Sequence, residues 1–97
     1  MIDEELKNEF ERNLSYKVQL CIKDVYRPQY LINLAAEEGY YIAAKKLITK
    51  PENTEGFTKL LLEGRVDLSI ENLVVQPEYT LLFSKEEIRM CKQRLGR

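Results

Sequence analysis

Apolar residues recur along this chain at helical intervals, and charged residues fill most positions between them. The first stretch places Ile2, Leu6, Phe10 and Leu14 at every fourth position. A spacing of three to four residues brings apolar side chains onto one face of an α-helix. The pattern therefore predicts an amphipathic first helix.

Residues 14–25 fit two patterns. The alternation of Tyr16, Val18 and Leu20 with polar neighbours is typical of a strand. Val18 and Cys21 also belong to a stripe with helical spacing. We favour the helix because a lone strand leaves its backbone groups without partners, and the strand stays open as the alternative.

Helix breakers and caps divide the remainder of the chain. Pro28 suits the first turn of a helix, Gly39 a left-handed stop, and Pro51 a loop over residues 50–53. We expect one helix from Pro28 to about Gly39 and a second from Tyr40 to Thr49. A third follows a cap at Asn53 and ends at Glu63, and a fourth follows a cap at Asp67 or Ser69 and ends at about Val75. The last helix begins after Ser84.

The last helix has the clearest local signal. Ser84 and Glu87 form a capping box, and Phe83 and Ile88 form the matching hydrophobic staple. Before it, Tyr79 to Phe83 reads as an apolar link that lies on the core. Periodicity predicts inward faces at Tyr30, Leu31, Leu34 and Ala35, and at Tyr41, Ala44, Leu47 and Ile48. The expected centre of the core is Phe57, Leu60, Leu73, Phe83, Ile88 and Leu95.

These elements predict an all-α fold, with 97 residues forming one small domain of five or six short helices. Residues 1–25 form its N-terminal helical region and residues 26–97 its core. No apolar run approaches the roughly 20 residues that span a bilayer, so we expect no membrane contact. The acidic N-terminus has no apolar stretch typical of a secretory signal, which indicates a cytoplasmic protein.

Charge changes this picture at the two ends only. The net charge is −1, but residues 1–13 hold five acids and two bases, and residues 84–97 hold two acids and five bases. We interpret both sets as complements of helix dipoles. The alternative is attraction between the terminal helices, within one chain or between two.

The chain has few residues for catalysis. It contains no histidine, which excludes Ser–His and Cys–His nucleophile pairs. Phosphate-binding glycine motifs are also missing, and Cys21 and Cys91 are expected to be reduced and buried. We therefore expect no enzymatic activity, no cofactor and no metal.

Tyrosines and bases cluster between residues 26 and 50. Tyr26, Tyr30, Tyr40 and Tyr41 are interpreted as core residues with hydroxyls at its edge. Aromatic residues among bases can also stack nucleotides, so Arg27, Lys45, Lys46 and Lys50 define a nucleic-acid-binding alternative. The candidate interaction residues are Arg27, Tyr40, Lys45, Lys46 and Arg65.

The segment from Gly56 to Glu71 is the most distinctive stretch. We interpret Gly64, Arg65, Asp67 and Glu71 as a structural clasp, in which Arg65 pairs with Asp67 or Glu71 across a helix corner. The functional alternative is that Arg65 binds a carboxylate or phosphate of a partner.

The chain resembles a family of small, largely uncharacterised bacterial proteins and protein tails, and the resemblance implies no activity. It runs from Tyr26 to Leu95 and includes the motif G-F-x-x-L-x-x-x-G-R-x-D-L-S-x-E. The matching residues are Tyr26, Arg27, Pro28, Tyr30, Leu31, Gly39, Ala44, Lys45, Lys46, Leu47, Gly56, Phe57, Leu60, Gly64, Arg65, Asp67, Leu68, Ser69, Glu71, Val74, Leu82, Phe83, Glu86, Glu87, Arg94 and Leu95.

Our leading hypothesis is a non-catalytic module that binds another protein or its own copy. A small core and oppositely charged ends favour association. The alternatives are a nucleic-acid-binding helical domain and a small enzyme or enzyme accessory subunit with Lys, Tyr or acidic residues in a cleft.

Overall fold

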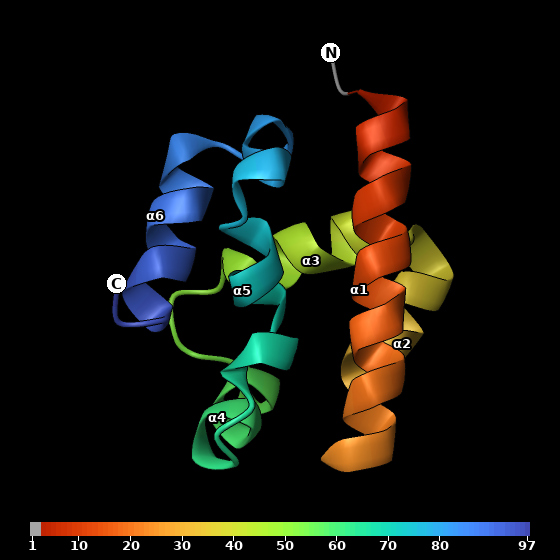
Figure 1. The fold of residues 1–97 in the computed structure, drawn as a ribbon, viewed down its shortest axis with the longest axis vertical. Coiled ribbons are helices and arrows are strands. Elements are labelled where there is room, and N and C mark those ends of the chain that lie inside the picture. The colour runs from red at the N-terminus through yellow and green to blue at the C-terminus, as the bar shows by residue number, and fades with distance from the viewer. Residues whose placement is uncertain (1–2) are drawn as a thin grey trace.

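The computed structural model describes residues 3–97, so the expected first apolar position, Ile2, lies outside the described residues. Residues 3–97 form only helices, turns and loops, which confirms the all-α prediction and the helical interpretation of residues 14–25. The elements are α1 (Glu4–Asp24), α2 (Gln29–Glu38), α3 (Tyr40–Ile48), α4 (Glu55–Leu62), α5 (Ile70–Val74) and α6 (Lys85–Arg94), with 3-10 helices η1 (Val66–Leu68) and η2 (Pro77–Leu82) (Figure 1).

Helix α1 forms where the sequence pattern predicts it. The carboxylate of Asp3 accepts a hydrogen bond of 3.1 Å from the Leu6 amide and caps the helix. The stripe at Phe10, Leu14, Val18 and Cys21 is buried, and it gives α1 one apolar face against the other helices.

Gly39 is the single residue between α2 and α3, and the chain turns there. Its φ of 88° is a conformation that only glycine adopts without strain, and its amide donates to the Ala35 carbonyl at 2.7 Å. The expected stop at Gly39 is therefore confirmed. Pro28 precedes α2 instead of lying in its first turn, and Tyr30 is 63% exposed, so the prediction that it is buried is wrong.

The later caps follow the predicted chemistry with small shifts. Thr54 caps α4, one residue after the expected Asn53, and Ser69 caps α5, which settles the choice between Asp67 and Ser69. The capping box of Ser84 and Glu87 is present as predicted. The hydroxyls of threonine and serine, like the side-chain oxygen of asparagine, accept hydrogen bonds from the first free amides of a helix.

Phe10 lies at the centre of the main core. Its ring meets those of Tyr79, Phe83 and Tyr41 edge to face, with centroids 5.3, 5.2 and 6.3 Å apart. Such packing adds to the free energy of burial. Of the expected core residues, Phe57, Leu60, Leu73 and Phe83 are buried, whereas Ile88 and Leu95 are only half-buried.

The helices surround α3, with α1 on one side and α6 on the other, and α4 lies beside the C-terminal half of α1 (Figure 1). Within residues 3–97, no ion pair joins the acids near the start of α1 to the bases of α6. The attraction between the terminal helices therefore stays an alternative, without a direct ion pair in the described residues. None of the described helices combines the length and the apolar character needed to cross a membrane; a cytoplasmic location stays a prediction.

Candidate docking cleft

A cleft of about 690 Å³ lies between the C-terminal half of α1 and α4, and the contact of Cys21 with Leu60 and Leu68 forms part of its wall. Its walls include apolar residues of five segments, among them Val18, Leu31, Leu47, Phe57 and Leu68. Its mouth is formed by residues 26–30 and 50–55. The volume lies within the range of about 300–1,000 Å³ that is typical of binding pockets. The cleft is therefore the candidate site.

A buried ion pair joins α5 to α6 beside the cleft. Arg94 donates to Glu71 at 2.9 Å, and the two side chains are only 6% and 4% exposed. Glu71 also belongs to the cleft wall. A charge buried to this degree is tolerated only with a partner and further hydrogen bonds.

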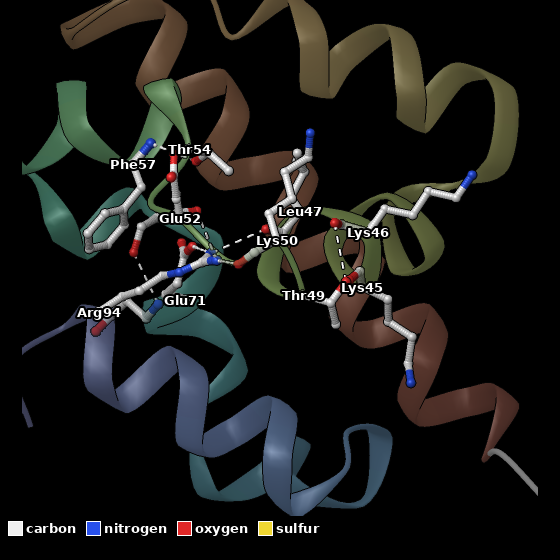
Figure 2. Close-up of polar contacts among 12 residues, drawn as sticks. Lys45, Lys46, Leu47, Thr49, Lys50, Glu52, Thr54, Phe57, Glu71 and Arg94 are labelled. Carbon is white, nitrogen blue, oxygen red and sulfur yellow. Dashed lines mark hydrogen bonds and ion pairs between the residues drawn. The ribbon is translucent and has the colours of Figure 1, made fainter.

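Arg94 supplies those further bonds to the last turn of α3 and to the loop between α3 and α4. Its guanidinium donates to the backbone carbonyls of Leu47 and Glu52, each at 3.2 Å, and to that of Lys50 (Figure 2). The same loop forms one side of the cleft mouth. The Arg94 side chain of α6 therefore holds the α3–α4 loop in place at the cleft mouth.

Burial raises the pKa of Glu71, and the hydrogen bond and charge of Arg94 act in the opposite direction. The net direction is upward because the carboxylate has lost nearly all of its water. Arg94 thus opposes the effect of burial on the Glu71 carboxylate.

Tyr26 bridges the mouth to the first turn of α4. A Cβ atom at Gly56 would lie 2.6 Å from the Tyr26 hydroxyl oxygen, so glycine makes room for this approach. The Lys59 ammonium lies 4.8 Å from the centre of the Tyr26 ring. Close packing against Tyr26 therefore explains why a glycine stands at position 56 of the motif.

The expected clasp forms, but without Glu71. Arg65 pairs with Asp67 at 3.2 Å and with Asp24 at the end of α1 at 3.4 Å. The hydrogen bond from Arg65 lowers the pKa of Asp67. Gly64 has a φ of 69° and turns the chain between α4 and η1. Glu71 points instead to Arg94, so its predicted place in the clasp is wrong.

The predicted interaction residues lie in different places and make different contacts. Lys45 pairs with Glu87 at 3.2 Å and Lys46 with Glu38 at 2.6 Å, whereas Arg27 lines the cleft mouth. Tyr40 is half-buried against two clusters of core residues. Of the predicted set, only Arg27 therefore belongs to the cleft.

The thiol and the phenol that line the cleft, Cys21 and Tyr26, favour their protonated forms. Burial raises the pKa of the Cys21 thiol and of the Tyr26 hydroxyl, and it raises the pKa of Cys91, in the main core, to about 12. A thiol becomes a nucleophile only as the thiolate. Within residues 3–97, no group of three or more Cys, Asp or Glu side chains is arranged to hold a metal ion.

Sequence reasoning missed both the Glu71–Arg94 pair and the cleft. The sequence predicts for Arg94 only the role of a cation at a helix end, and 23 residues separate it from its partner. Comparison with family models, characterised proteins and solved structures finds no match to this chain. The function is therefore argued from the site alone, and the family resemblance stays a prediction.

Proposed function

We propose that this chain is a non-catalytic interaction module that docks an apolar segment of a partner protein in the cleft between α1 and α4. The observation that carries the proposal is the cleft of about 690 Å³ with apolar walls of Val18, Leu31, Phe57 and Leu68. Grooves of this kind take the apolar face of a partner helix.

The side chains of the cleft support binding over catalysis. The Cys21 thiol and Tyr26 hydroxyl have raised pKa values because of burial, and Glu71 is held by Arg94. A catalytic base or nucleophile needs a pKa near the working pH and access to a substrate. These groups lack that combination.

The arrangement of bases favours a protein partner over a nucleic acid. Lys45 and Lys46 each pair with a carboxylate, which leaves Arg27 and Lys50 from the basic set. Binding to a phosphate backbone draws its affinity from many uncompensated cations. A second copy of the chain is the alternative protein partner, and light scattering after size-exclusion chromatography distinguishes it.

Site-specific photocrosslinking tests the proposal. A photoreactive benzoylphenylalanine replaces Tyr30 at the cleft mouth or, as a matched control, Leu81 on η2; these side chains are 63% and 85% exposed. In cells of the native source, we expect a discrete crosslinked protein from position 30 and none from position 81. Equal crosslinking at both positions, or none at position 30, would overturn the proposal.

A further inference from the structure

Two cations and one aromatic ring form a basic lip on the α2 side of the cleft mouth. Its residues are Arg27, Tyr30 and Lys50, all exposed and all lining the cleft. The Lys50 ammonium lies 5.4 Å from the centre of the Tyr30 ring, which draws this loop residue toward α2. The Arg27 Nε donates a hydrogen bond of 2.9 Å to the side-chain oxygen of Gln29, and the N–H groups on its two terminal nitrogens remain for a ligand.

The carboxylates around the mouth leave this lip positive. Glu55 pairs with Lys59 on α4, and Glu71 pairs with Arg94. Glu52 is the remaining acid, and Figure 2 shows the Lys50 side chain extending away from both Glu52 and Arg94. Within residues 3–97, neither Arg27 nor Lys50 takes part in an ion pair. Two cations therefore face solvent beside an apolar cleft.

We propose that the docked segment carries an Asp or Glu next to its apolar residues, and that Arg27 and Lys50 bind this carboxylate. The inference rests on the proposed docking function and names the chemistry of the partner. An apolar side chain fills the cleft while the acid meets the lip. Charges at the rim of an interface set specificity and association rate, and their effect falls as salt rises.

Selection from a library of displayed random peptides tests the inference with the full chain. The baits are the wild type, the double variant Arg27→Gln and Lys50→Gln, and the matched control Lys85→Gln and Lys92→Gln, which removes the same charge from α6. All four positions are exposed, so each bait is expected to fold. Selected peptides are then synthesised, with each acid also replaced by its amide, and their affinities are measured by fluorescence anisotropy.

We expect the wild type and the α6 control to select peptides that combine apolar residues with an acid. Loss of both lip cations should weaken these peptides about tenfold at low salt, since exposed ion pairs each contribute up to about fivefold. The amide forms of the peptides should bind the wild type about tenfold more weakly than the acids do. Their affinity should be the same for the wild type and for the variant without the lip cations. Amide resonances that shift on binding should map to the cleft.

Other outcomes separate the two proposals. Apolar peptides that bind in the cleft without an acid, and equally to all baits, would overturn the acidic partner but leave docking in place. If no peptide binds in the cleft, both proposals fail. Displacement of peptides by dodecanoate but not by dodecyltrimethylammonium supports carboxylate recognition. Dodecanoate binding without any bound peptide assigns the cleft to a small amphiphile instead, and this would also overturn both.

Discussion

Replacing Arg94 with Met tests how the ion pair beside the cleft contributes to the fold. The substitution keeps most of the apolar stem and removes the guanidinium, so Glu71 stays buried without its partner. The carbonyls of Leu47, Lys50 and Glu52 lose the same donor. The substitution therefore weakens the contact between α5 and α6 and the attachment of the end of α3 and the α3–α4 loop to α6.

The expected cost is about 3–5 kcal/mol, the usual result of removing one partner from a buried pair. A domain of this size is stabilised by only about 5–15 kcal/mol. One kcal/mol moves the melting temperature of a small domain by about 4–8 °C, so Tm should fall by at least about 12 °C. Replacing Glu71 with Leu as well should recover part of the loss, because no unpaired charge then remains.

The pH dependence identifies the mechanism. Burial already raises the pKa of Glu71, and removal of Arg94 takes away an opposing influence, so the folded-state pKa rises further. A group with a raised folded pKa contributes stability below its unfolded pKa and loses it as pH rises through the folded value. The difference in stability between wild type and variant should therefore grow as pH rises above the unfolded pKa of Glu71 and shrink as pH falls toward it.

Urea titrations followed by circular dichroism measure these values at each pH. Arg89→Met on the same helix is the matched control, since Arg89 and Glu86 form an ion pair that is 61% and 65% exposed. We expect no measurable change in stability from it. A difference below 1 kcal/mol for Arg94→Met, or one that does not vary with pH, would refute the role given to the pair.

Three further predictions concern packing and reactivity. Gly39→Ala should cost about 1–3 kcal/mol in thermal denaturation, because its φ of 88° strains any side chain and its Cβ would lie 3.0 Å from Glu11. Gly56→Ala should be more favourable by about 0.5 kcal/mol or more in a Tyr26→Phe background than in the wild type, and a double-mutant cycle without coupling contradicts the bridge. Cys91, with its pKa near 12 and no exposed surface, should resist iodoacetamide at pH 8 until urea unfolds the chain, as peptide mapping will show; rapid native labelling contradicts its burial.

Helix positions could be predicted because their signals are local. The Ser84 capping box, the Gly39 stop and the α1 stripe each depend on residues a few positions apart, and all three were predicted correctly. Errors arose where two nearby residues compete for one role. Thr54 caps α4 in place of Asn53, and in α2 Leu31 is buried as predicted whereas its neighbour Tyr30, also predicted inward, is exposed.

The candidate site could not be predicted in the same way. The pairing of Glu71 with Arg94 depends on how α5 packs against α6, and no periodicity connects the two positions. The cleft arises where helices fail to meet, which is a property of the packed structure alone. Arg27 was predicted as an interaction residue from its aromatic neighbours, yet its place at an apolar mouth required the fold.

The bonds from Arg94 to the α3–α4 loop link the cleft to a helix that does not line it. If docking favours one position of that loop, it also favours the position of α6, because Arg94 bonds α6 to the loop carbonyls of Lys50 and Glu52. Thermodynamic linkage is reciprocal, so whatever restrains α6 will alter affinity at the cleft by the same factor. Filling the cleft should then slow hydrogen exchange in α6 (Lys85–Arg94), although none of its residues lines the cleft.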